Sequence, residues 1–167
     1  MKRLGSRKLP SKPLTPDQVL ERMERYCAYQ ERCPSEVAAK LREFDLPAVE
    51  AGQIYQLLQA EGFFDEKRFA EAFTRGKFRS NRWGRARIRL ELLRRAIDPQ
   101  LIEEALAQID PQEYLQVLDA AIARRQTADA VERAKTAAAL IRAGYEPALV
   151  FERLKIAGSD ALDKDML

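Results

Sequence analysis

The sequence contains no histidine, only two cysteines and a single tryptophan among its 167 residues. Histidine is the commonest general base and a frequent metal ligand, so its absence removes the first candidate for acid–base catalysis and the usual partner ligand of zinc. Cys27 and Cys33 have a spacing that suits neither a disulfide framework nor a standard metal site, and we interpret both as small buried hydrophobic residues. The sequence also has no glycine-rich phosphate loop. We therefore expect no metal, no cofactor, no catalytic residue and no enzymatic activity.

Long apolar runs are missing as well. No stretch approaches the roughly 20 residues that span a bilayer, and the basic start of the chain lacks the apolar segment of a secretory signal. These absences favour a cytoplasmic protein that makes no membrane contact. Hydrophobic residues make up 46% and charged residues 33% of the chain, with seven glycines and eight prolines, which is typical of a folded helical protein.

Positive charge is concentrated in two segments of the chain. Residues 1–16 carry five positive charges and no negative one, and residues 67–95 carry eleven positive charges against two negative ones. These segments contribute +5 and +9 to a net charge of +3, so the remaining residues carry −11. Such segregation favours a polyanionic or acidic macromolecular partner. Glycine, proline and basic residues without a helical apolar period predict a flexible N-terminal arm over residues 1–14.

Helix start signals and apolar periodicity predict an all-α protein. Three short segments combine an N-capping side chain with a proline at the first helical position: Thr15-Pro16, Asp98-Pro99 and Asp110-Pro111. No segment of useful length alternates as a strand does. The apolar spacing predicts helices over residues 16–32, 35–44, 47–61, 66–80, 84–96, 99–109, 111–126, 128–143 and 147–157.

The apolar landmarks recur with a period near 50 residues. A shift of 51 positions relates three residues to three others, and a further shift of 48 reaches a third set: Val37, Leu41 and Leu46, then Ile88, Leu92 and Ile97, then Thr136, Leu140 and Tyr145. This period predicts three tandem three-helix modules, in an elongated and curved arrangement, at residues 15–62, 63–110 and 111–158, followed by a tail at 159–167. We expect a monomer.

Two linked motifs stand in the middle module. An acidic residue followed by Arg-Phe-Ala precedes a glycine followed by Arg-Ile and Glu-Leu, and the residues are Asp65, Arg68, Phe69, Ala70, Gly84, Arg87, Ile88, Glu91 and Leu92. This pair of motifs resembles the signature of the RecX family, most strongly over residues 63–97 and, through the module layout, over about 15–157. The chain departs from the pattern at Arg85, where many relatives have proline, and at Ala96, where a glycine commonly ends the helix.

The resemblance implies a regulatory protein that binds RecA. It would lodge in the groove of the RecA filament on single-stranded DNA and restrain strand exchange and ATP hydrolysis during DNA repair and the SOS response. The alternative is a direct DNA-binding helical module for single- or double-stranded DNA, because three-helix units are similar to helix-turn-helix domains. A helical scaffold for another partner is a third reading. Salt dependence and the requirement for RecA separate the first two.

Most motif residues fit a structural role as well as a functional one. Apolar spacing favours core packing for Phe69, Phe73, Ile88 and Leu92. On the helix predicted at 84–96, Ile88 and Leu92 form one apolar stripe, and a second stripe predicts packing on two sides: Ala86, Leu90, Leu93 and Ile97. The motif residues that we interpret as structural are Asp65, Phe69, Ala70, Gly84, Ile88, Glu91 and Leu92.

The basic residues of the middle module are the candidate partner-binding site. Arg87 and Glu91 are at ion-pair spacing, so for Arg87 and for Arg68 a structural role and a binding role are equally favoured. Five basic residues have no acidic partner nearby in the sequence, which favours an interaction surface: Arg75, Lys77, Arg79, Arg82 and Arg89. Trp83 is either a wedge between modules or an exposed anchor. The complete candidate set is Arg68, Arg75, Lys77, Arg79, Arg82, Trp83, Arg85, Arg87 and Arg89.

Overall fold

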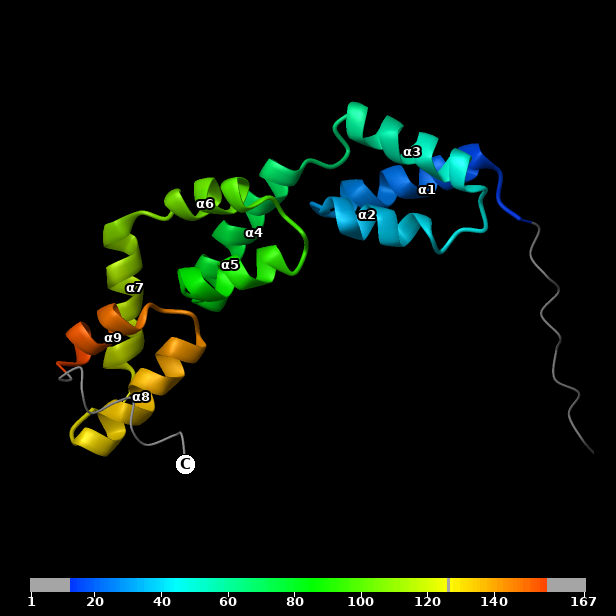
Figure 1. Ribbon diagram of the computed structural model, residues 1–167. Coiled ribbons are helices and arrows are strands. Elements are labelled where there is room, and N and C mark those ends of the chain that lie inside the picture. Colours follow the sequence, from blue (N-terminus) through cyan, green and yellow to red (C-terminus); the bar gives the residue numbers. More distant parts are fainter. Residues whose placement is uncertain (1–12, 126, 156–167) are drawn as a thin grey trace, which may run out of the picture. The chain divides into compact units, whose positions relative to one another are not determined.

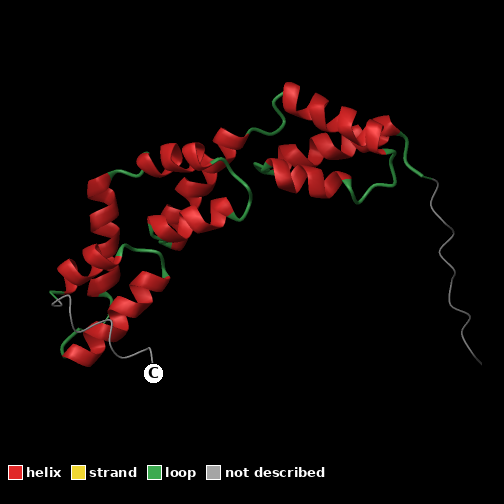
Figure 2. Ribbon diagram, viewed as in Figure 1, coloured by secondary structure: helices red, strands yellow, loops and turns green. Residues whose placement is uncertain are grey.

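The computed structural model describes residues 13–125 and 127–155, and within these ranges the chain is helical with no strand (Figures 1 and 2). The predicted all-α class is therefore confirmed. Most of the predicted N-terminal arm and the whole predicted C-terminal tail lie outside the described residues. The helices are α1 (Pro16–Tyr29), α2 (Pro34–Leu41), α3 (Ala48–Ala60), α4 (Glu66–Asn81), α5 (Arg85–Leu93), α6 (Pro99–Ala107), α7 (Pro111–Ala123), α8 (Ala130–Arg142) and α9 (Pro147–Leu154).

The predicted capping residues begin their helices as expected. Thr15 and Gln18 form a reciprocal capping box at α1, with N–H to side-chain oxygen distances of 3.1 and 3.4 Å. Asp98 and Asp110 each accept a backbone N–H at 2.7 Å at the start of α6 and α7. α1 ends earlier than predicted, because Gln30 is already extended and Cys33 takes the extended conformation that the following proline favours.

The chain divides into two compact units, residues 1–65 and 66–167. In the first unit, α1, α2 and α3 bury one apolar cluster that includes Met23, Val37 and Leu58. Both cysteines are free and buried, and burial raises the pKa of each thiol. The predicted burial of both side chains is confirmed, and the Cys33 sulfur also contacts the Ser35 hydroxyl at 3.2 Å.

The second unit contains α4 to α9, so two of the predicted modules pack within one compact body. The repeat landmarks of these helices are all buried: Ile88, Leu92, Ile97, Thr136, Leu140 and Tyr145. α5 and α8 end in equivalent turns, at Ala96 (φ 56°) and Gly144 (φ 97°), and in each turn the next residue donates its N–H to a carbonyl five positions back. The elongated arrangement and the three module boundaries stay predictions.

The length of the helices and the polarity of their side chains decide whether any of them could cross a membrane. Among the described residues, no helix has the length and apolar character needed to cross a bilayer.

Candidate functional site

The candidate basic residues lie on α4, on the turn after it, and on α5. Arg82 takes a left-handed conformation with φ 56° and donates its N–H to the Phe78 carbonyl at 3.1 Å, which ends α4. The chain then reverses through Trp83 and Gly84 into α5, so that α5 packs against α4 and α6. The turn therefore places basic side chains from two helices on both flanks of this helix pair.

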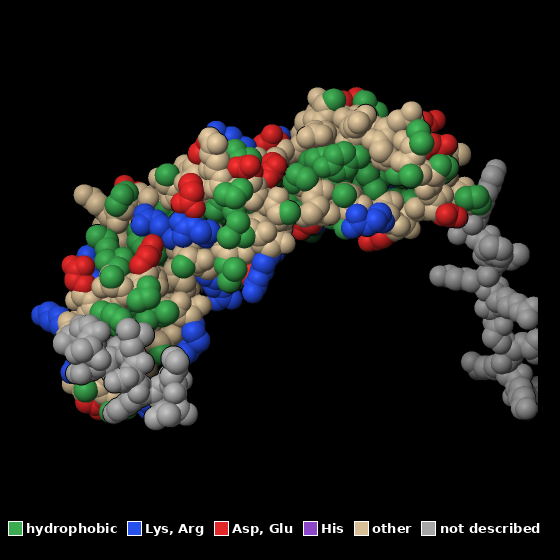
Figure 3. Space-filling view, viewed as in Figure 1, with side chains coloured by type: hydrophobic (Ala, Val, Ile, Leu, Met, Phe, Trp, Pro, Cys, Tyr) green, Lys and Arg blue, Asp and Glu red, His purple; other side chains and the backbone are tan. Residues whose placement is uncertain are grey.

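One flank is neutralised by acidic side chains from later helices. Arg89 donates two hydrogen bonds to the Glu103 carboxylate of α6, at 2.7 and 2.8 Å, and Arg79 lies 3.6 Å from Glu113 of α7. The hydrogen bond from Arg89 is the main cause of the lowered pKa of Glu103. Basic and acidic side chains accordingly lie next to one another near α6 and α7 (Figure 3). The expectation that Arg79 and Arg89 are unpaired is wrong, because their partners are distant in the sequence.

The other flank carries alternating cationic and aromatic side chains, which we call the cation–aromatic ladder. The Arg87 guanidinium lies 4.0 Å from the centre of a Trp83 ring. The Lys77 ammonium lies 5.0 Å from Trp83 and 5.3 Å from Phe73, and the Arg95 guanidinium lies 4.8 Å from Phe73. All four distances are within the range of a cation–π interaction. Phe73 is only half-buried and belongs to the ladder, which corrects its predicted place in the core.

Glu91 pairs with other arginines than the one predicted. Its carboxylate accepts hydrogen bonds from Arg95 and Arg94, each at 2.9 Å, and these bonds hold the pKa of Glu91 below its usual range. The Arg87 guanidinium lies over Trp83 instead. Arg87 is therefore exposed on the surface and does not hold the module together through Glu91.

The second apolar stripe of α5 is not packed. Leu90 and Leu93 are 48% and 45% exposed and Ala86 is exposed, whereas Ile88 and Leu92 are fully buried. The prediction of packing on two sides is wrong because α4 and α6 cover one side of α5, and Ile97 reaches the core only after the chain has left the helix at Ala96.

Gly84 makes a backbone contact that the sequence analysis did not identify. Its N–H donates to the Ala143 carbonyl at 2.9 Å, and the N–H of Ala86 donates to the Gly144 carbonyl at 3.0 Å. A Cβ on Gly84 would lie 2.2 Å from the Gly144 carbonyl group, so only glycine permits this approach. The turn before α5 is thereby joined to the turn after α8.

Two tyrosines reinforce this junction. The Tyr114 hydroxyl accepts the N–H of Arg85 at 3.2 Å and donates to the Glu146 carboxylate at 2.7 Å. The Tyr145 hydroxyl donates to the Arg82 carbonyl at 3.1 Å. Proline at position 85 has no N–H to donate, so the departure of this chain from the family pattern supplies a hydrogen bond. The pKa of Tyr114 is raised, mainly because burial disfavours the charged phenolate.

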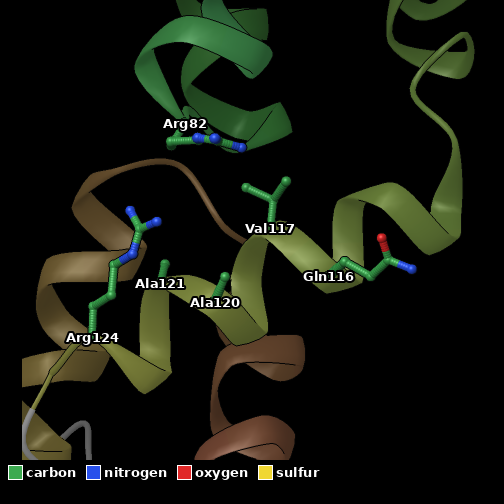
Figure 4. Close-up of a pocket in the computed structure, with 6 residues that line it drawn as sticks. All are labelled: Arg82, Gln116, Val117, Ala120, Ala121 and Arg124. Atoms are coloured by element: carbon green, nitrogen blue, oxygen red, sulfur yellow. The ribbon is translucent and has the colours of Figure 1, made fainter.

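Arg82 also faces a shallow cleft on α7. Arg82 lies above the cleft and Arg124 rises toward it from the end of α7, Val117, Ala120 and Ala121 lie on the α7 side, and Gln116 points away (Figure 4). Within the part of the chain that the structure describes, neither arginine has an acidic partner. Arg124 adds positive charge from a helix that the candidate set did not include.

The remaining predicted residues divide by exposure. Arg68, Arg75 and Asp65 are exposed, and Arg85 is half-buried with its guanidinium 4.1 Å from the Tyr114 ring. The motif residues in the core are Phe69, Ala70, Gly84, Ile88 and Leu92. The described residues contain no group of three or more acidic or cysteine side chains arranged to hold a metal.

Comparison with known proteins finds similarity over the middle of the chain. Residues 65–106 match the family model of the second three-helix domain of RecX. The regulatory protein RecX of Geobacillus kaustophilus is 30% identical over 92 residues, which are 55% of this chain and 34% of that protein. The regulatory protein RecX of Oceanobacillus iheyensis is 27% identical over 100 residues, 60% of this chain and 37% of that protein. The matched segment thus spans about a third of these relatives.

Two solved structures share the fold. A crystal structure of a regulatory protein RecX superimposes with a TM-score of 0.72 at 25% identity, covering 84% of this chain and 71% of the other. The RecX structure from Lactobacillus salivarius gives a TM-score of 0.74 at 22% identity, covering 84% and 94%.

Proposed function

We propose that this chain, whose residues 65–106 match the second three-helix domain of RecX, is a RecX-type cytoplasmic regulator of the RecA recombinase that binds the RecA filament on single-stranded DNA. Its binding restrains strand exchange and ATP hydrolysis in DNA repair and the SOS response. The chain acts by association and not by catalysis.

The observation that carries this proposal is the position of the unneutralised basic surface. α4, α5 and the turn between them lie entirely within the 65–106 match, and they carry Lys77, Arg82 and Arg87. Basic side chains that keep their charge attract acidic protein surfaces and phosphates, and they speed encounter with such partners. The segment that identifies the family is thus also a surface suited to a nucleoprotein filament.

Basic residues that pair with a carboxylate and basic residues that do not are expected to contribute differently to partner binding. Arg79 and Arg89 already have carboxylate partners, so a RecA or DNA contact must compete with Glu113 and Glu103. Residues without this competition contribute most, with Trp83 as an anchor. We assign the partner contact mainly to Arg75, Lys77, Arg82, Trp83 and Arg87. Arg68 and Arg85 lie near them but already have interactions within the chain, so we assign them a smaller part.

The test is RecA ATPase activity on single-stranded DNA with increasing amounts of the full chain. We expect progressive inhibition near stoichiometric amounts. The double variant Lys77→Gln/Arg87→Gln is expected to need roughly tenfold more protein for the same inhibition. Its matched control, Arg79→Gln/Arg89→Gln, also loses two positive charges and is expected to stay within about threefold of the native protein, since these charges are already neutralised.

Two results contradict the proposal. Absence of inhibition at stoichiometric amounts removes the proposed function, and equal loss in both double variants removes the assignment of the surface. Direct DNA binding, the alternative, predicts association without RecA that weakens steeply as salt rises.

A further inference from the structure

We propose that the cation–aromatic ladder is a base-stacking platform for single-stranded DNA, with Trp83 and Arg87 at its centre. The inference rests on the proposed function and deepens it, because it assigns this face to the DNA strand of the filament and not to RecA.

The Arg87 side chain is a prepared stacking surface. Its guanidinium lies 4.0 Å from the centre of a Trp83 ring, and the residue is exposed. Unpaired bases stack both on aromatic rings and on arginine guanidinium planes. A base that stacks on Arg87 meets a planar cation already supported by the indole.

The rest of the ladder repeats this pairing of charge and ring. Lys77 lies between Trp83 and Phe73, at 5.0 and 5.3 Å from their rings. Arg95 covers Phe73 at 4.8 Å, but its charge is already paired with Glu91, so Lys77 and Arg87 are the cations available to phosphates. Proteins that bind single strands combine aromatic side chains for the bases with cations for the phosphates. The alternation along α4 and α5 offers both kinds of contact to one strand.

The junction with α8 fixes the centre of the ladder. Gly84, next to Trp83, is bonded to Ala143, and a Cβ on Gly144 would lie 2.4 Å from the Cβ of Arg87. The backbone that carries both residues is therefore packed against a second backbone. A contact surface that is already ordered loses less conformational freedom on binding.

The rings favour a single strand over the other anionic partners. In a duplex the base faces are already stacked on one another, so a duplex offers the ladder only phosphates and groove edges. An acidic protein surface would pair with the cations, but it has no unpaired base faces to stack on a guanidinium plane. The exposed Arg87 guanidinium, which lies over the Trp83 ring, offers such a plane to the face of an unpaired base.

The single tryptophan makes the proposal directly measurable. Trp83 is the only tryptophan in the chain, so the intrinsic fluorescence of the full native protein reports on this position alone. The titrants are an oligothymidylate, an abasic strand of the same length and phosphate number, and a duplex. We expect the oligothymidylate to quench Trp83 and to bind at least fivefold more tightly than the abasic strand at the same salt. Equal affinity and equal fluorescence change with the abasic strand overturn the proposal.

Variants separate stacking from charge. The Trp83 variants lack tryptophan, so their binding is followed by the anisotropy of a dye-labelled oligothymidylate. Trp83→Leu is expected to weaken binding roughly fivefold or more, whereas Trp83→Phe retains most of the affinity. Arg87→Gln and its control Arg79→Gln each remove one charge, and only the first is expected to lower the preference over the abasic strand. Circular dichroism checks folding; if Trp83→Leu does not fold, the Trp83→Phe and Arg87→Gln comparisons decide. Equal losses for Arg87→Gln and Arg79→Gln contradict stacking.

The RecA ATPase assay, run in parallel, keeps the two proposals apart. Inhibition by a native protein that binds abasic and normal strands equally retains the proposed function and rejects the stacking platform. Base-dependent quenching of Trp83 fluorescence without any effect on the RecA ATPase retains the stacking platform and rejects the proposed function.

Discussion

The backbone contact between Gly84 and Gly144 makes Gly84→Ala the most informative substitution in the second unit. The new methyl group would lie 2.2 Å from the Gly144 carbonyl carbon and oxygen, and 2.3 Å from the Tyr145 nitrogen. These atoms belong to a backbone and not to a flexible side chain, so the two turns must separate.

The cost follows from the interactions that depend on this approach. Separation removes two backbone hydrogen bonds, from Gly84 to Ala143 and from Ala86 to Gly144, and it disturbs the bond from Tyr145 to Arg82. Each is worth about 0.5–1.5 kcal/mol net. We therefore expect the free energy of unfolding to fall by roughly 2–4 kcal/mol.

Urea unfolding followed by Trp83 fluorescence measures this loss next to the substituted residue. Gly76→Ala is the matched control, because a Cβ at that position on α4 meets nothing within 4 Å. Replacing a glycine inside a helix stabilises by roughly 0.5–1 kcal/mol, so the control is expected to unfold at a higher urea concentration. If Gly84→Ala unfolds at the same concentration as the native protein, the two turns are not in contact in solution and the argument fails.

Two further predictions concern single positions. Ala96 is left-handed at φ 56° where the equivalent Gly144 is glycine, so Ala96→Gly is expected to raise the free energy of unfolding by roughly 0.5–1 kcal/mol, and an unchanged or lower urea midpoint contradicts this. Tyr114→Phe removes the hydroxyl that bonds Arg85 and Glu146, for an expected loss of roughly 1–3 kcal/mol at neutral pH. Burial raises the pKa of Tyr114 in the folded state, so the stability that its hydroxyl contributes is fully present below about pH 10 and declines above it. The melting temperature of Tyr114→Phe should therefore fall less steeply at alkaline pH than that of the native protein.

Local signals in the sequence predicted the helices well. Asp98 and Asp110 cap the helices they were expected to begin, and the left-handed turn at Ala96 lies where the family pattern has the glycine that commonly ends the helix. These features depend on residues within a few positions of one another. A capping bond or a turn is determined by its immediate neighbours, which the sequence presents in order.

The interaction surface was harder to predict because its chemistry depends on distant residues. Glu103 and Glu113 neutralise Arg89 and Arg79 from other helices, so counting charges along residues 67–95 overestimated the free positive charge. The contact at Gly84 has an ordinary negative φ, so no backbone preference indicated it. Only the packing of α5 against the turn after α8 gives this glycine its role.

The repeat itself shows how one fold produces different surfaces. The shift of 51 that relates α2 and α3 to α5 and α6 places Ala38 and Gly52 where the later helices have Arg89 and Glu103. The first unit has an apolar groove at this place, lined also by Phe44, whereas the second unit has an ion pair. Hydrophobic side chains are visible on the first unit in Figure 3.

Transfer of the ion pair to the first unit tests this equivalence. A Cβ on Gly52 meets nothing within 4 Å, so Ala38→Arg/Gly52→Glu is expected to fold. A double-mutant cycle should give a favourable coupling of about 0.2–1 kcal/mol, the usual value for an exposed pair, and high salt should reduce it. Gly52→Gln is the neutral control, because it fills the same space and gains the same helix propensity without the carboxylate. Equal coupling energies of Ala38→Arg with Gly52→Gln and with Gly52→Glu would show that position 38 does not face position 52 as Arg89 faces Glu103. The two units would then share their helix order but not this contact.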